Sequence, residues 1–425
     1  MGKLTDKYEK TMKLSIFEGA LYTFSFNATQ GFVYSTLAME YGFSPVVLSV
    51  IAVLPSTAQI IQLFTPMIYK LIPSKRKAIF WTSLIARSSF IIIPISMLLE
   101  IKSYKIIVLP FIVFNILNSI VGNLWTSAMK NIVPEEKRNR YFGFRNTVAT
   151  FAGLTACVLF SIILQFLDRK VGLLIIYSLS AGIFIYTSYL LYLHSIPETK
   201  VVDFGISAVF STLKNKKFAQ FLGFVFVWNF AIQFAGPFFS YFEVSQLKVP
   251  YSYLGFLNVI NSVLAMFLYT FYGKISTNVG EKNMIRYGIT LALGIPLIYS
   301  FMTPSNYKYL LIIDVIIAAL GWSAINLSYF TLLLKISDEP SENFISLHAF
   351  VAGLASLIAS YSGGKVLSAI KDIEFGFLTG YNILFMIAFI LRIIALIYFI
   401  KLNLGEDKRN LRFTQIAYMI VTRRF

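Results

Sequence analysis

Apolar segments of about 20 residues recur along the whole chain, and each is long enough to cross a lipid bilayer as a helix. The chain has 425 residues, of which 57% are hydrophobic and 13% are charged. Soluble proteins carry about 25% charged residues, so this composition excludes an ordinary soluble domain. We predict an all-α polytopic membrane protein with twelve transmembrane helices, at about 14–40, 44–69, 78–99, 106–129, 146–167, 172–193, 218–242, 252–272, 284–303, 309–334, 345–369 and 377–400.

The basic residues are spread unevenly over the segments that separate these spans. The formal net charge is +17, from 37 Lys and Arg against 20 Asp and Glu. Most of the bases fall on alternate segments, beginning with the N-terminal one, and bases that flank membrane helices gather on the cytoplasmic side. We therefore expect a multi-pass protein of the cell membrane with both termini in the cytoplasm and membrane lipid as a partner. We expect no nucleic acid partner, because the bases are not gathered on one exposed face.

A long segment between spans six and seven, residues 195–217, divides the spans into two groups of six. We predict an N-terminal six-helix bundle at 1–194, a central cytoplasmic loop at 195–217 and a C-terminal six-helix bundle at 218–404. In the cytoplasmic tail at 405–425, bases alternate with apolar residues towards the end, which predicts an amphipathic segment on the membrane surface.

Short motifs support a division into two related halves. The sequence FAGL at 151–154, in span five, recurs as VAGL at 351–354, in span eleven. The loop after span eight, at 273–282, reads GKISTNVGEK, and the loop before span five, at 137–145, reads KRNRYFGFR. Together with the six-plus-six plan, these motifs resemble the major facilitator superfamily of secondary transporters. The loop at 66–77 keeps only the basic end of that family's signature.

The resemblance implies two six-helix bundles that move a solute by alternating access. It also implies that spans one, four, seven and ten line a central cavity. Residues of the two loop motifs would act in gating, and these are Gly273, Gly280, Lys282, Arg138, Arg140 and Gly143.

Polar side chains recur at helical spacing within spans one, four, seven and ten. In span one, Thr23, Asn27 and Gln30 follow one helical face. A polar side chain that faces lipid costs free energy, so such faces either line a solvated cavity or form hydrogen bonds between helices. We predict the cavity. The predicted solute-binding residues are Asn27, Gln30, Tyr34, Asn115, Asn118, Trp125, Asn229, Gln233, Trp322, Asn326 and Tyr329.

The charged residues within the predicted spans include Asp314, Glu18, Arg87 and Arg392, and a charge in such a place is costly. Asp314, in span ten, either carries a proton or cation or reaches the outer headgroup water. Glu18, at the start of span one, is either a second proton carrier or an interfacial carboxylate. Arg87, in the middle of span three, pairs with an acid or a helix end, or binds an anionic substrate. Arg392, in span twelve, lies close enough to the inner surface to extend towards it.

These features predict a secondary active transporter of a small organic solute, in which any coupling to protons would run through Asp314 or Glu18. Because the cavity spans carry no cluster of bases, we expect a neutral or cationic solute. A lipid flippase or scramblase on the same scaffold is an alternative, and a membrane-embedded enzyme is a weaker one. The cysteine and histidines of the chain are Cys157, His194 and His348. They predict no metal site and no cofactor. We expect a monomer.

Overall fold

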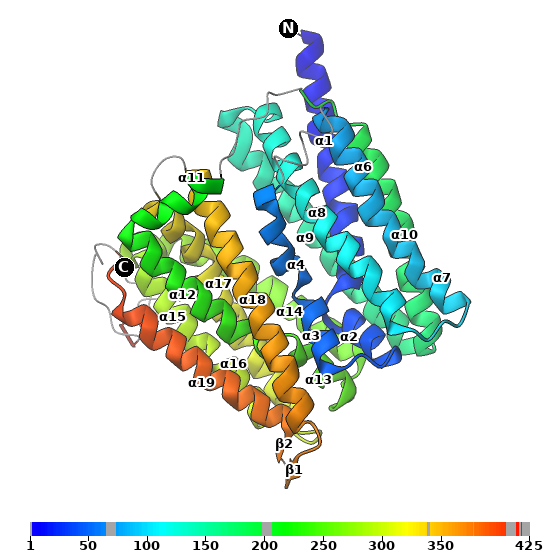
Figure 1. Ribbon diagram of the computed structural model, residues 1–425, viewed down its shortest axis with the longest axis vertical. Helices are drawn as coiled ribbons and strands as arrows, with labels where there is room; N and C mark the ends of the chain where they lie inside the picture. The colour runs from blue at the N-terminus through cyan, green and yellow to red at the C-terminus, as the bar shows by residue number, and fades with distance from the viewer. Residues whose placement is uncertain are drawn as a thin grey trace. The chain divides into compact units, whose positions relative to one another are not determined.

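The computed structural model describes residues 2–64, 74–197, 206–337, 341–376, 378–404, 414–415 and 418. Apart from one short ribbon, the regular elements among these residues are helices (Figure 1). In the ribbon, β1 (Glu374–Phe375) pairs antiparallel with β2 (Leu378–Thr379), with Glu374 opposite Thr379.

The chain separates into two compact units. Unit 1 comprises Met1–Phe204 with Glu243–Ser245 and Val249–Gly255. Unit 2 comprises Gly205–Phe242, Gln246–Lys248 and Phe256–Phe425.

The first 204 residues contain the following helices. They are α1 (Gly2–Phe26), the 3₁₀ turn η1 (Asn27–Thr29), α2 (Gly31–Glu40), α3 (Pro45–Ala52), α4 (Leu54–Thr57), η2 (Ala58–Phe64), α6 (Lys75–Ser88), η3 (Ser89–Ile91), α7 (Ile92–Leu98), α8 (Tyr104–Ile132), α9 (Glu135–Phe166) and α10 (Arg169–Tyr192).

The rest of the chain contains a second series. Its helices are α11 (Ile206–Ser211), η4 (Thr212–Lys214), α12 (Lys216–Gln233), α13 (Phe238–Ser245), α14 (Tyr251–Val279), α15 (Glu281–Ala292), α16 (Gly294–Ser300), α17 (Tyr307–Ile336), α18 (Ser341–Ile370) and α19 (Gly380–Lys401).

Nine helical segments of the described residues are long and apolar enough to cross a membrane. They are Lys75–Leu98, Tyr104–Met129, Tyr141–Phe166, Arg169–Tyr192, Lys216–Ser245, Tyr251–Gly273, Tyr307–Leu333, Asn343–Ile370 and Gly380–Lys401. They coincide with nine of the twelve predicted spans. Of the other three, 14–40 and 284–303 are built from two shorter helices each, and 44–69 extends into residues outside the described ranges.

Several helices begin at a residue that caps them. Ser44 accepts a hydrogen bond from the Val47 N–H at 3.3 Å, with Pro45 in the first turn of α3. Asp168 accepts from the Lys170 N–H at the start of α10, and Asn215 accepts from the Phe218 N–H at the start of α12. These side chains satisfy N–H groups that have no partner inside the helix, so they fix where each helix starts.

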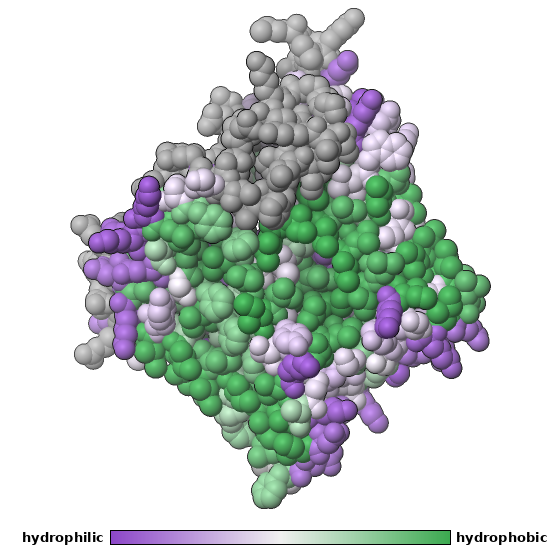
Figure 2. All heavy atoms as spheres, in the orientation of Figure 1, coloured by the Kyte–Doolittle hydropathy of each residue, from purple (hydrophilic) through white to green (hydrophobic). Residues whose placement is uncertain are grey.

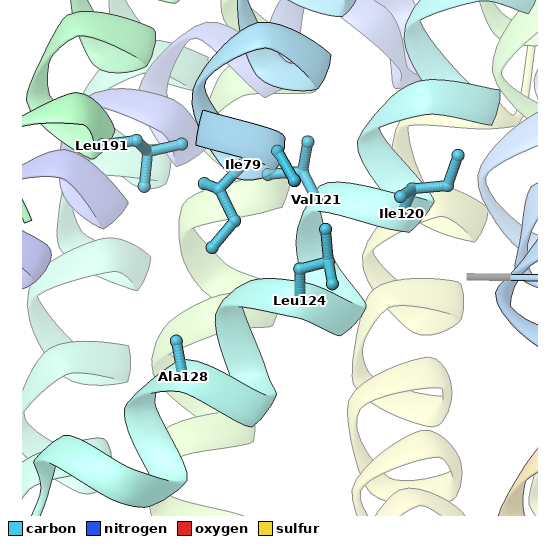
Figure 3. Close-up of a cluster of buried hydrophobic side chains, with 7 residues drawn as sticks. Ile79, Ile120, Val121, Leu124, Ala128 and Leu191 are labelled. Carbon is cyan, nitrogen blue, oxygen red and sulfur yellow. The ribbon is translucent and has the colours of Figure 1, made fainter. Parts of the chain in front are cut away.

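The core of unit 1 forms where α6, α8 and α10 lie side by side (Figure 1). Figure 3 shows one of its clusters, in which Ile79 from α6 and Leu191 from α10 meet Val121 and Leu124 from α8. Each of these side chains keeps 4% or less of its surface exposed. Close packing of this kind holds membrane helices together, because lipid is as apolar as the side chains themselves.

In unit 2, α15 and α17 approach through two glycines. A Cβ atom at Gly288 would lie 2.7 Å from the Gly321 carbonyl oxygen, and one at Gly321 would lie 3.0 Å from the Gly288 carbonyl oxygen. The two backbones can therefore touch only because neither residue has a side chain. The second packing layer of this unit joins α12 to α18 and α19.

The surface over α19 is dominated by hydrophobic side chains (Figure 2). Ile390, Ile394 and Ile397 are about half exposed, at 51%, 51% and 48%. Their spacing places them on one helical face. Such a face suits contact with lipid, as a membrane helix requires.

The first span is interrupted, so the prediction of one continuous helix over 14–40 is wrong. The chain leaves the helix at Asn27, Gln30 is extended with φ −146°, and α2 starts at Gly31 with φ +59°. Only glycine adopts this left-handed backbone readily, so Gly31 permits the break. Span seven is interrupted at the corresponding place in the second half, between Gln233 and Phe238.

Spans three and nine also correspond, and both deviate before a proline. Pro94 lacks the N–H that would bond to the Phe90 carbonyl, and the 3₁₀ turn η3 lies there. Pro296 leaves the Ala292 carbonyl free in the same way, and α15 ends at Ala292. The interruptions therefore repeat between the two groups of six spans.

Candidate functional site

Unit 1 contains a buried group of three charges, which we call the charge cluster: Glu18 on α1, Arg87 on α6 and Arg145 on α9. Arg87 Nη1 lies 3.0 Å from Glu18 Oε1, and Arg145 Nη2 lies 3.9 Å from Glu18 Oε2. The side chains of Glu18 and Arg87 are each 4% exposed. The Glu18 carboxylate is thus buried and ion-paired, and Arg87 has an acid as its partner.

Aromatic rings lie against both arginines. The Arg87 guanidinium carbon lies 4.8 Å from the centre of the Tyr22 ring, and that of Arg145 lies 4.3 Å from the Trp125 ring. Asn118 Nδ2 donates a 2.6 Å hydrogen bond to the Tyr22 hydroxyl. These contacts hold the two cations in place by cation–π attraction.

The charges of this cluster do not balance. Two guanidinium groups face one carboxylate, and these are the ion pairs recorded for Glu18 among the described residues. Guanidinium groups stay protonated in proteins. The cluster therefore carries an excess positive charge in a largely buried place, where uncompensated charge is expensive.

The other polar residues predicted in unit 1 lie in different surroundings. Asn27 donates to the Thr23 carbonyl and Asn115 to the Phe111 carbonyl, each one helical turn earlier. Gln30 is exposed at the break in span one. Tyr34 is 3% exposed and donates to the Leu48 carbonyl at 2.8 Å, so its hydroxyl is occupied in packing.

An open cavity of about 680 Å³ lies at the ends of α2, α7 and α10. Its lining includes none of the predicted solute-binding residues. The lining residues are Glu40, Tyr41, Gly42, Met97, Glu100, Ile101, Lys102, Lys170, Val171 and Leu174.

In unit 2, two of the residues predicted in span ten, Trp322 and Tyr329, pack against other aromatic side chains. Trp322 lies 6.0 Å from Trp228, ring centre to ring centre. The Tyr329 hydroxyl lies 3.1 Å from His348 Nε2 of α18, and its ring packs against Phe221. The sequence did not indicate His348, because a single histidine in a Ser- and Gly-rich span carries no pattern.

The other predicted residues of unit 2 are more accessible. Asn229 is half-buried and donates to the Val225 carbonyl, and Gln233 is half-buried at the end of α12. Asn326 is exposed, and its Nδ2 lies 3.3 Å from the Tyr269 hydroxyl.

Arg392 is buried inside unit 2 and does not extend to the membrane surface. It is 2% exposed, and its Nη1 donates to the Ala292 carbonyl at 2.6 Å. This is the carbonyl that Pro296 leaves without a helical partner, so the arginine satisfies it. Asp314 is 8% exposed and attracts Arg392 electrostatically. Asp314 is therefore largely buried within the protein.

Comparison with known proteins identifies the fold. The model of the Major Facilitator Superfamily matches residues 16–364. The chain belongs to the Major Facilitator Superfamily. This confirms the predicted fold class, an all-α polytopic membrane protein of major facilitator type, and it identifies the protein as a transporter. No curated protein sequence matches the chain.

Solved structures of this superfamily resemble the transporter over nearly its whole length. A variant of the nucleoside transporter NupG has a TM-score of 0.73 at 14% identity, covering 93% of this chain and 99% of that one. A POT family peptide transporter has a TM-score of 0.72 at 12% identity, covering 96% and 100%. A bacterial homolog of the human lysosomal transporter Spinster, inward-facing and unoccupied, has a TM-score of 0.69 at 13% identity, covering 99% and 98%. These likenesses concern the fold.

The predicted gating residues of this superfamily member are only partly described. Gly280 has φ +86° and directly precedes α15 as its N-cap residue, so a glycine is favoured there. Glu281, next to it, forms an ion pair with Lys335 of α17. Gly273, Lys282 and Gly143 lie on helices α14, α15 and α9. The side chains of Arg138 and Arg140, the loop at 65–73 and most of the tail at 405–425 lie outside the described residues.

Sequence reasoning missed Arg145 as a site residue of this transporter. The basic run KRNRYFGFR, at 137–145, is typical of a loop, which predicts that span five starts at 146. In the structure α9 starts at Glu135, so Arg145 lies well inside the helix. Among the described residues, no group of three His, Cys, Asp or Glu side chains is placed to hold a metal ion.

His194, just after α10, provides a pH test of the transporter's stability. Its Nδ1 donates to the Leu190 carbonyl at 2.8 Å, and Nε2 is buried with no partner among the described residues. Burial lowers the pKa of His194 below its usual value of about 6.5. Below that pH the unfolded chain binds a proton that the folded protein does not, so stability falls on acidification. We expect His194→Gln to lose less thermal stability than wild type between pH 7.5 and pH 5.5. Equal losses would contradict the role of His194.

Proposed function

We propose that this transporter moves a small organic solute across the cell membrane by alternating access, as a monomer with both termini in the cytoplasm. The observation that carries the proposal is the pair of interruptions in spans one and seven, which occupy corresponding places in the two halves. A break frees backbone carbonyls and N–H groups, and inside a membrane these are tolerated where they contact a cavity or a ligand. The positive-inside distribution supports the orientation.

Each break carries an amide that is suited to contact a solute. In unit 1 this is Gln30, at the break of span one, and in unit 2 it is Gln233, at the break of span seven. The paired indoles Trp228 and Trp322 add an aromatic wall for an organic ring. Polar groups concentrated at helix breaks favour a soluble solute over a lipid, so we place solute transport ahead of lipid flipping.

Reconstitution tests the proposal. Purified protein in liposomes is expected to take up at least one member of a panel of labelled nucleosides, small peptides and organic anions and cations above protein-free vesicles. Gln30→Ala and Gln233→Ala should each lower uptake about tenfold, the effect of one lost hydrogen bond to the solute. Their thermal stability should match wild type, because neither side chain forms a hydrogen bond with the residues that the structure describes. Uptake that is unchanged in both variants would remove the helix breaks from the solute site.

We propose that proton coupling, if the transport is driven, runs through Asp314 rather than Glu18. Glu18 is engaged in ion pairs with two guanidinium groups of unit 1, which proton transfer would have to disrupt. Asp314 is an acid within span ten, one of the spans expected to line the cavity. Asp314→Asn should abolish accumulation driven by a proton gradient while solute exchange continues. Asp168→Asn is the matched control, since Asn caps α10 as well as Asp does. Normal accumulation by Asp314→Asn would refute the coupling role.

A further inference from the structure

We infer that Arg145 is the anion-binding residue of a solute site in unit 1, and that the natural solute carries a carboxylate or phosphate group. The inference rests on the proposed function, whose site it deepens by naming the chemical class of the solute. It differs from the expectation of a neutral or cationic solute, which considered only spans one, four, seven and ten and not Arg145 on α9.

The charge cluster lacks one negative charge. Arg87 and Glu18 neutralise each other at 3.0 Å, and Arg145, at 3.9 Å, is left over. Among the described residues, the two arginines otherwise contact the aromatic rings, and Arg145 donates to one backbone carbonyl. A single oxyanion would bring the cluster to neutrality, which is the charge state that a partly buried site favours.

The hydrogen bonds of the same region point to the same ligand. Arg87 Nε and Trp125 Nε1 are buried donors with no acceptor among the described residues, and Asn118 Oδ1 is a buried acceptor without a donor. Unsatisfied buried donors are costly, so these two N–H groups favour a ligand that has several hydrogen-bond acceptors. A carboxylate or phosphate presents several acceptor oxygens and no obligatory donor.

Of the two arginines, Arg145 is the one that a carboxylate or phosphate ligand can reach. Its side chain is 16% exposed, whereas those of Arg87 and Glu18 are 4% exposed. Its Nε donates to the Ser15 carbonyl at 3.3 Å, which leaves the terminal nitrogens to receive an anion. Gly19 makes room for it, since a Cβ there would lie 2.5 Å from Arg145 Nη2.

The orientation of the Arg145 guanidinium is fixed by its contact with an aromatic ring. It lies on the Trp125 ring, and a fixed guanidinium binds a carboxylate or phosphate in two parallel hydrogen bonds. Trp125 belongs to the polar face of span four, which continues to Asn118 and Asn115. The anion site thus adjoins side chains that can contact the rest of an organic solute.

The probes are benzoate and phenyl phosphate, with benzamide as the uncharged match for benzoate. Thermal melting of the full chain in phosphatidylcholine nanodiscs should shift upwards with benzoate or phenyl phosphate and not with benzamide. Arg145→Gln should abolish the shift, and Arg145→Lys should keep part of it, because a lysine retains the charge without the planar fork. Arg76→Gln is the matched control, since Arg76 lies 4.5 Å from the Tyr192 ring and forms no ion pair with an acid in the described part of the chain; it should keep the wild-type shift.

Other results would overturn the inference. An equal shift with benzamide, no shift with either anion, or a shift that survives in Arg145→Gln would each do so. A melting temperature of ligand-free Arg145→Gln well below wild type would show a structural residue instead, because removing the excess charge should leave it unchanged or higher. If phosphatidylglycerol in the nanodiscs gives the stabilisation by itself and removes the benzoate response, the occupant is a lipid phosphate and not the solute.

The test separates this inference from the proposed function. Anion-dependent melting with no uptake of any panel solute would retain the anion site and refute solute transport. Uptake confined to uncharged or cationic solutes, with no anion-dependent melting, would retain transport and refute the anion site.

Discussion

Glu18→Gln is expected to destabilise the protein by about 3–5 kcal/mol, the usual cost of removing one partner from a buried ion pair. The carboxylate is the only negative group recorded against Arg87 and Arg145 among the described residues. Without it, two guanidinium groups remain in a place where Arg87 is 3% exposed. The loss should be seen as a lower melting temperature in nanodiscs and as faster unfolding in denaturant.

The control is a double variant, Glu18→Gln with Arg87→Gln, in which the net charge of the charge cluster equals that of wild type. Glu18→Gln raises the excess of the cluster by one positive charge, and adding Arg87→Gln returns it to the wild-type value. The double variant should therefore be more stable than Glu18→Gln alone, with a favourable coupling in the double-mutant cycle. If the effects of the two substitutions on the free energy of unfolding are additive, the Glu18–Arg87 ion pair does not stabilise the protein as proposed.

Gly363→Ala is expected to cost about 3 kcal/mol or more and to abolish transport. Gly363 lies on α18 against the backbone of Phe234, where α12 ends and the break of span seven begins. A Cβ at position 363 would overlap the Phe234 carbonyl group. Backbone cannot move aside as a flexible side chain does, so α18 would have to shift away from the break.

Gly182→Ala tests whether this effect is specific. A Cβ at Gly182, on α10, would have no neighbour within 4 Å. Replacing a mid-helix glycine by alanine in open space should stabilise the protein by about 0.5–1 kcal/mol. Melting and uptake measured for both variants would show whether steric overlap at Gly363 decides the outcome. A Gly363→Ala protein with wild-type melting and uptake would show that α18 and the break are not in firm contact.

The fold was largely predictable because a bilayer imposes one simple requirement. A span must supply about 20 apolar residues, and hydropathy along the chain records that directly. The break in span one was not predictable in the same way. No proline marks it, and Gly31 alone does not distinguish a break from an ordinary glycine in a helix. The proline-linked deviations at Pro94 and Pro296 left a clearer signal.

The partners within the site could not be read from the sequence. Glu18 and Arg87 belong to different helices, and so do Asp314 and Arg392, so no spacing along the chain relates them. Each residue was recognisable as a costly intramembrane charge, but its compensation depends on how the helices pack. Arg145 was not predicted as a site residue because the predicted span five starts at 146, whereas α9 starts at Glu135.

The excess charge of unit 1 has an electrical consequence. A membrane potential acts on every charge within the low-dielectric layer, with about 2.3 kcal/mol per elementary charge for 100 mV across the full thickness. A cell with a negative interior therefore biases the empty unit towards conformations that bring Arg145 closer to the cytoplasm. An anion seated on Arg145 removes that bias. Voltage would then act mainly on the return of the empty carrier, so the rate of the transport cycle would depend on potential even where solute binding does not.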